Sequence, residues 1–280
     1  MLSAARVSVE ANEYMKNFRK WLVYGIVPAI VMLLIIGMYF SHNTVLQRIV
    51  CPKLPPLPVD SWREFGLLEL LQNVCLVIMA ATLAYGVFKL RSLRERAACA
   101  LLCLFTLFVL GEEIDYGTHI YRFVTTERST GWFTPVTQWA PGVLENTVWD
   151  APNVNIHNRG NLTDVFKHVA DVILFGLFII FALAGPRIPR PWLKRLAPDR
   201  FAILTVLLMV VLNQITHGLG EYEEHVIENA VRLGQTIPWE VGSITNNLSE
   251  FRELIVYYLF MVYVISVVRR HVKAIPLPQA

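Results

Sequence analysis

The sequence predicts an all-α membrane protein: a single domain, residues 1–280, folded as a polytopic bundle of six transmembrane helices. Of the 280 residues, 55% are hydrophobic and only 17% carry a charge, whereas soluble domains carry about 25% charged residues. A spanning helix needs roughly 20 mainly apolar residues, and six segments reach or approach that length. The expected helices are residues 22–40, 66–88, 97–114, 165–184, 201–219 and 251–268.

The first apolar segment is expected to be a membrane helix and not a cleaved signal peptide. Its apolar core is too long for a signal peptide, and no small-residue cleavage site follows it. The connection after it, residues 42–63, contains four prolines and predicts a stiff extended strap. The third segment is the shortest, because its apolar run ends at Leu110.

Basic residues flank the predicted helices on alternate sides. They are Arg6, Lys16, Arg19 and Lys20 before the first helix, Lys89, Arg91, Arg94 and Arg96 after the second, Arg187, Arg190, Lys194, Arg195 and Arg200 after the fourth, and Arg269, Arg270 and Lys273 after the sixth. Cytoplasmic loops carry such an excess of Lys and Arg. We therefore expect a multi-pass protein of the cytoplasmic (inner) membrane with both termini in the cytoplasm. These anchors explain the net charge of +3, and no basic-aromatic stripe predicts nucleic-acid binding.

Three connections are expected on the outer, non-cytoplasmic side: residues 42–63, 117–164 and 220–249. The segment 117–164 contains Trp132, Trp139 and Trp149 and little charge. Spaced tryptophans are typical of the membrane interface, so this loop is expected to pack there, or to form a lid over an outer site. The segment 220–249 is rich in glutamate.

Two adjacent glutamates, Glu112 and Glu113, end the third predicted helix. This helix runs outward, so they lie at its C-terminus, where the helix dipole disfavours acids by a few tenths of a kcal/mol to about 1 kcal/mol each. They therefore need a partner or a bound metal to offset that cost. Glu69 and Glu253 start other helices, where the dipole favours acids, so capping explains them equally well. Asn73 and Tyr257 follow these two glutamates by four residues and are expected on the same helix faces.

Six of the seven histidines fall on the same outer side as these acids. Converging histidines and carboxylates predict a site, with Glu112, Glu113 and His157 as the catalytic candidates. The candidate metal ligands are Glu112, Glu113, His157, His168, His217 and Glu253. Carboxylate with imidazole suits Zn, Mn or Fe, but no specific metal motif selects one, so the cofactor stays open. Cys99 and Cys103 could bind a metal. The favoured interpretation is that they are two small buried residues at a contact between helices.

Two motifs in the sequence carry a family resemblance. Residues 111–117 (GEEIDYG), followed by 155–158 (NIHN), resemble a family of uncharacterised bacterial polytopic membrane proteins with the pattern GEEISWGQ and NLHN. Residues 63–69 (REFGLLE) resemble the acidic start of the preceding helix in that family. Asp115 and Thr118 depart from the pattern. The resemblance implies a membrane bundle and brings no activity with it. The twin glutamates also resemble the EExxxR motif of CAAX-type intramembrane proteases, but Gly117 replaces the arginine and the FxxxH motif is absent.

The sequence is therefore compatible with three alternative classes of function. The first is a membrane enzyme that uses the Glu/His site for metal-dependent or acid–base chemistry on a lipid-like substrate. The second is a non-catalytic accessory subunit that binds protein partners of a larger membrane complex. The third is a transporter, which is disfavoured because no helix has a polar break at its middle and no clear inverted repeat is present. In each case the lipid bilayer is the surrounding partner.

Overall fold

The computed structural model describes residues 2–41, 43–50, 67–114, 161–235 and 248–273, and within these residues it contains helices and no strand. Five of the described helices are long and apolar enough to cross a membrane. They are Asn12–Met38, Leu67–Lys89, His168–Arg187, Ala202–Arg232 and Glu250–Lys273. The prediction of an all-α fold with several helices able to span a membrane is thus confirmed for the described residues, and the count of six spans stays a prediction.

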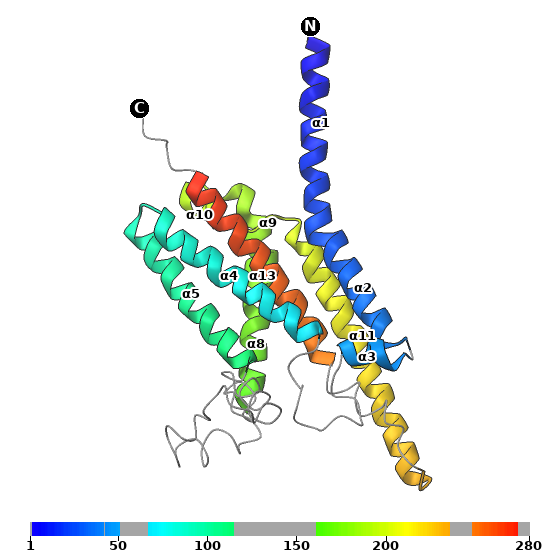
Figure 1. Cartoon of the computed structure of the whole chain (residues 1–280). Coiled ribbons are helices and arrows are strands. Elements are labelled where there is room, and N and C mark those ends of the chain that lie inside the picture. The colour runs from blue at the N-terminus through cyan, green and yellow to red at the C-terminus, as the bar shows by residue number, and fades with distance from the viewer. Residues whose placement is uncertain (1, 42, 51–66, 115–160, 236–247, 274–280) are drawn as a thin grey trace, which may run out of the picture.

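The long helices pass alternately between the two ends of one bundle (Figure 1). The chain starts with a continuous helical rod, which consists of α1 (Leu2–Trp21), η1 (Leu22–Ile26) and α2 (Val27–Tyr39). The short helix α3 (Thr44–Val50) follows it. Then come α4 (Leu67–Lys89), α5 (Leu93–Glu113), α8 (Asn161–Phe175) with η3 (Gly176–Phe181), α11 (Ala202–Arg232) and α13 (Leu248–Lys273). The start of α1 and the end of α13 therefore lie at the same end of the molecule.

Helix α5 packs closely against α4 but is not among the five candidate spans. Its uncharged stretch, residues 97–111, covers roughly 22 Å at about 1.5 Å per residue, which is shorter than a hydrocarbon core of about 30 Å. A Cβ atom on Gly86 of α4 would lie only 2.9 Å from the Cys99 sulfur, so glycine permits the close approach. The Cys103 thiol lies 3.5 Å from the carbonyl of Ala80. The two cysteines thus serve the helix contact, as the favoured interpretation predicts.

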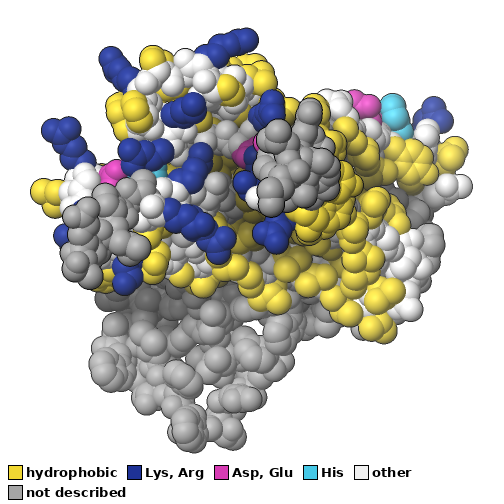
Figure 2. All heavy atoms as spheres, turned by 90° about the horizontal axis from the view of Figure 1, so that it is seen from above, with side chains coloured by type: hydrophobic (Ala, Val, Ile, Leu, Met, Phe, Trp, Pro, Cys, Tyr) yellow, Lys and Arg dark blue, Asp and Glu magenta, His cyan; other side chains and the backbone are white. Residues whose placement is uncertain are grey.

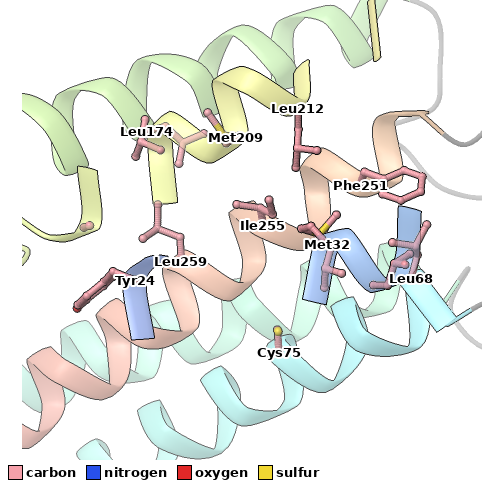
Figure 3. Packing of buried hydrophobic residues seen from close by; sticks show 14 of the residues in the cluster. Tyr24, Met32, Leu68, Cys75, Leu174, Met209, Leu212, Phe251, Ile255 and Leu259 are labelled. Carbon is pink, nitrogen blue, oxygen red and sulfur yellow. The ribbon is translucent and has the colours of Figure 1, made fainter. Parts of the chain in front are cut away.

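Helix α13 forms the centre of the core. Figure 3 shows it between α4 on one side and α11 on the other, with Ile255 and Leu259 facing the interior. Both residues have 1% of their surface exposed. Met32 from α2 and Leu174 from α8 complete the same cluster. The same helix carries Glu250, Glu253 and Tyr257.

A proline explains the π-helical segment η1 in the first rod. The Val27 N–H donates to the Leu22 carbonyl, five residues back, and Pro28 has no N–H to donate to the Val23 carbonyl. Two other helices donate to the carbonyls of this segment. The Tyr258 hydroxyl of α13 donates to the Val23 oxygen over 2.6 Å, and the buried Thr205 hydroxyl of α11 donates to the Tyr24 oxygen over 2.6 Å.

A second π-helical segment, η3, follows α8. Its Phe178 has no exposed surface and meets Phe260 and Tyr263 of α13 edge-on, with ring centroids 5.2 and 5.4 Å away. Three short helices connect it to α11: α9 (Ala182–Ala184), η4 (Gly185–Arg187) and α10 (Pro191–Leu196).

One end of the bundle is rich in Lys and Arg, and we call it the basic end. Figure 2 views this end from above and shows dark blue side chains distributed across it. It is tied together by polar contacts: Lys20 pairs with Asp199 over 2.7 Å, and Arg270 donates to the Ala197 carbonyl over 2.8 Å. The Tyr263 hydroxyl donates to the Leu196 carbonyl over 2.8 Å.

The structure corrects several expected boundaries. The segment 201–219 was expected to end where the glutamate-rich connection 220–249 starts, but α11 continues to Arg232, so the first part of that connection is helix. The connection 42–63 is not extended throughout, because α3 is helical. In the connection 117–164, α8 already begins at Asn161. Residues 51–66 with their prolines and 115–160 with Trp132, Trp139 and Trp149 lie outside the described residues, so the strap, the interface packing and the lid stay predictions.

Candidate functional site

The acids gather at the end of the bundle opposite the basic end, because three helices have their termini there. Helices α4 and α13 begin at this end and α5 finishes at it (Figure 1). The first turn of α4, the first two turns of α13 and the last turn of α5 bring five glutamates to this end. We call it the acidic end and define it by Glu69, Glu112, Glu113, Glu250 and Glu253.

A hydrogen bond between α5 and α13 is the most specific feature of the acidic end. The Tyr257 hydroxyl donates to Oε1 of Glu113 over 2.5 Å, and both side chains are half-buried. Helical side chains lean toward the N-terminus of their own helix, so Tyr257 reaches from within α13 toward the bundle end where Glu113 lies. The carboxylates of Glu253 and Glu250 are close enough to act electrostatically on the same hydroxyl.

A buried glutamine joins α4 to the same group of acids. Gln72 has none of its surface exposed, and its Nε2 donates over 3.0 Å both to the Glu250 carbonyl and to Glu250 Oε2. These two acceptors fix the orientation of the amide. Its Oε1 is buried and, like Oδ1 of the neighbouring Asn73, accepts no hydrogen bond within the described part of the chain.

Glu112 is the most buried of these acids, with 4% of its surface exposed. It neighbours Glu113 in the last turn of α5, and successive positions on a helix point in different directions. Burial of a carboxylate is costly unless it is paired, hydrogen-bonded or protonated. Glu112 is therefore not a solvated side chain, whereas the catalytic and metal-binding roles expected for Glu112 and Glu113 stay predictions.

An ion pair connects α8 to this end. Arg252 of α13 binds the carboxylate of Asp171 on α8. The Asp171 side chain is largely exposed and that of Arg252 is mostly buried. The pair tethers α8 beside the three helices that carry the acidic end.

The predicted metal ligands are not all brought together. Glu113 and Glu253 both lie near Tyr257, and Glu112 belongs to the same helix end. His168 on α8 and His217 on α11 are exposed, and His157 lies outside the described residues. Among the residues that the structure describes, no group of three or more His, Cys, Asp or Glu side chains could hold a metal ion. A metal set completed by His157 stays a prediction.

The sequence analysis missed Gln72 and Arg252. A glutamine within the apolar run of α4, three residues after Glu69, was the available signal for Gln72. The available signal for Arg252 was its position between Glu250 and Glu253 at the start of α13, since a single basic residue among acids favours an ion pair. Tyr257 was placed on the face of Glu253, and the structure adds its hydrogen bond to Glu113.

No family model, curated protein or solved structure matches this chain. The described residues form a helical bundle with five candidate membrane spans, and a carboxylate–tyrosine pair and a buried amide lie at one bundle end. A carboxylate and a phenol that share a hydrogen bond can accept, hold and return a proton.

Proposed function

We propose that the protein is an integral membrane enzyme that performs acid–base chemistry on a lipid-like substrate at its acidic end. The observation that carries this proposal is the 2.5 Å hydrogen bond between Tyr257 and Glu113. A pair of this kind provides a base and an acid within reach of one reacting group. Its place near the end of membrane-crossing helices favours a substrate that is itself in the bilayer.

Each residue of the pair has a distinct role in this proposal. Glu113 accepts a proton from the substrate and Tyr257 gives its proton to the departing group. The proton on Glu113 then passes to the Tyr257 phenolate along their hydrogen bond, which restores both residues. Glu112, buried beside Glu113, tunes the charge of the site. His157 is the third proposed catalytic residue, and a divalent metal shared by His157 and the glutamates is the proposed metal-dependent form of the site.

The orientation of the chain is part of the same proposal. We infer that α5 is a sixth span and that both termini are cytoplasmic, which places the acidic end on the outer side of the inner membrane. The concentration of Lys and Arg at the opposite end supports this orientation. Cys51 lies in the connection expected outside, so the test uses a Cys51→Ser background. In intact cells, a cysteine at the exposed Trp192 of α10 should then react with a membrane-impermeant maleimide only after permeabilisation. Labelling of the Trp192→Cys variant without permeabilisation would reverse the orientation.

The enzymatic proposal is tested with purified protein reconstituted in vesicles made from a total lipid extract. Mass spectrometry should detect lipid species that are formed or consumed during incubation with the wild-type protein. Glu113→Gln and Tyr257→Phe should each reduce that conversion roughly 100-fold or more, the scale of general acid–base catalysis. Glu221→Gln, at an exposed acid of α11, is the matched control and should convert lipid normally. If the wild-type protein changes no lipid species, the enzyme proposal fails.

The accessory-subunit alternative is supported by the surface of α5. This helix packs on α4, while Leu101, Leu104 and Phe105 remain largely exposed along its other side. A transmembrane helix of a partner could cover that apolar side. If Glu112→Gln and Glu113→Gln are both silent while the protein copurifies with a membrane complex, this alternative replaces the enzyme proposal.

A further inference from the structure

Helix α1 extends beyond the rest of the bundle at the basic end. Figure 1 shows it in dark blue above α2, clear of the other helices. The candidate span Asn12–Met38 covers about 40 Å as a helix, which is more than a hydrocarbon core of about 30 Å. Its uncharged part, residues 21–38, already covers about 27 Å. When this helix crosses a bilayer, residues 12–20 therefore lie outside the hydrocarbon.

The side chains of residues 12–21 divide between two sides of the helix. Tyr14, Phe18 and Trp21 follow each other at spacings of four and three residues, which places them on one side. Their surfaces are 71%, 47% and 49% exposed. Lys16 and Arg19 are exposed as well, and at 3.6 residues per turn they point roughly 100° or more away from the aromatic side. Aromatic residues on one side and Lys and Arg on the other are typical of helices that lie in the membrane interface.

The charge of residues 12–21 complements an anionic surface. The segment contains three basic residues and one acid, Glu13. Lys20 is bound to Asp199 at the start of α11, which leaves Lys16 and Arg19 as the two bases on the exposed length of the helix. Basic residues beside a membrane are attracted by the negative surface potential of anionic lipids, which zwitterionic lipids do not provide.

Contacts with α11 hold the base of this segment at the level where a neighbouring candidate span begins. The Trp21 ring meets Phe201 edge-on, with ring centroids 5.8 Å apart, and Phe201 directly precedes α11. Phe18 and Tyr14 lie about 4.5 and 10 Å further along the helix axis, whereas each headgroup layer is about 5–8 Å thick. An upright α1 would leave Tyr14 outside that layer, and an inclined α1 brings it inside. Helices kink at prolines and π-helical segments, and η1 with Pro28 lies directly below α1.

We propose that residues 12–21 bind the surface of a bilayer that contains anionic phospholipids. Helix α1 inclines at η1, so that Tyr14, Phe18 and Trp21 face the acyl boundary while Lys16 and Arg19 reach the lipid phosphates. This inference goes beyond the proposed function and requires no reaction at the acidic end.

A second copy of the chain is the competing occupant of the aromatic side. The seam of a coiled coil also has spacings of three and four residues, but it takes mainly aliphatic side chains. Tyrosine and tryptophan are instead enriched at membrane interfaces. Trp21 is also already in contact with Phe201 of its own chain. These observations favour the lipid surface.

Photo-crosslinking of the full-length protein in vesicles of phosphatidylcholine and phosphatidylglycerol tests where α1 lies. Benzoylphenylalanine replaces Tyr14 in one variant and Asn12 in the other. The two positions are close in height on α1 but about 160° apart around it, so the Asn12 variant is the matched control. The Tyr14 variant should form lipid adducts that mass spectrometry detects, and the Asn12 variant should form none. Crosslinked dimers at Tyr14, no product at Tyr14, or equal lipid adducts at both positions would overturn the proposal. Phe18 replaces Tyr14 if that variant is not produced.

The same adduct tests the preference for anionic lipid. Its yield should fall in vesicles of phosphatidylcholine alone. In the mixed vesicles, Lys16→Gln combined with Arg19→Gln should weaken surface binding about 30-fold and lower the yield. Arg190→Gln combined with Lys194→Gln removes two exposed bases of the same bundle end outside α1 and should leave the yield unchanged. Equal yields in the two kinds of vesicle, or with and without Lys16 and Arg19, would contradict binding to anionic lipid.

Discussion

The hydroxyl of Tyr258 should stabilise the fold by supplying the donor that Pro28 lacks. In the π-helical segment η1 the Val27 N–H is used by the Leu22 carbonyl, and Pro28 offers none to Val23. The 2.6 Å hydrogen bond from Tyr258 to the Val23 oxygen fills that gap. Tyr258→Phe removes only the hydroxyl. It should lower the free energy of unfolding by about 1 kcal/mol, the scale of one hydrogen bond lost from a part-buried carbonyl.

A second substitution tests whether the missing proline N–H is the cause. Pro28→Ala restores a main-chain donor five residues after Val23, at the spacing of a π-helix. In this background the Val23 carbonyl no longer depends on Tyr258, so Tyr258→Phe should cost markedly less than it does alone. The double-mutant cycle isolates the interaction between the two positions.

Unfolding of the purified protein by SDS in mixed micelles, followed by circular dichroism, measures these free energies. Tyr85→Phe is the matched control, since Tyr85 of α4 is 50% exposed and its loss of a hydroxyl should change stability by less than about 0.5 kcal/mol. The reasoning is refuted if Tyr258→Phe behaves like Tyr85→Phe, or if Pro28→Ala leaves the cost of Tyr258→Phe unchanged.

Two further substitutions test other contacts with the same unfolding assay. Gly86→Ala places a Cβ 2.9 Å from the Cys99 sulfur and should lower the free energy of unfolding by about 1–3 kcal/mol through overpacking. Adding Cys99→Ala should recover much of that stability. Equal losses of stability in the single and the double variant would contradict the contact. Asp199→Ala removes the acceptor of the Phe201 N–H, 3.1 Å away, and the ion-pair partner of Lys20. It should lower the free energy of unfolding by about 1 kcal/mol. Asp199→Asn should lose only the ion pair, because its side-chain oxygen can still accept from the Phe201 N–H.

Hydropathy predicted where the helices lie but not how far they extend. The apolar segment 201–219 identified α11, yet the helix continues to Arg232, because glutamate and alanine are good helix formers in water as well as in a membrane. Hydropathy marks the limit of the apolar surroundings, and a helix can continue beyond it. Likewise α5 is one helix from Leu93 to Glu113, although only its middle is apolar.

The candidate site was predictable in part, through the helix dipole. The unfavourable dipole at the C-terminus of α5 indicated that Glu112 and Glu113 need a partner, and the structure provides Tyr257 as the partner of Glu113. The dipole could not predict that His168 and His217 are exposed. The direction in which a residue near a helix end faces depends on how α8 and α11 are rotated against their neighbours. Packing of residues such as Leu174 and Leu212 sets that rotation.

The directions of the helices lower the electrostatic cost of gathering acids at the acidic end. The C-terminus of α5 carries a partial negative charge that disfavours Glu112 and Glu113. Helices α4 and α13 begin at the same end (Figure 1), and their N-termini carry partial positive charges of similar size. These two dipoles, with the hydroxyl of Tyr257, offset the unfavourable position of the α5 acids.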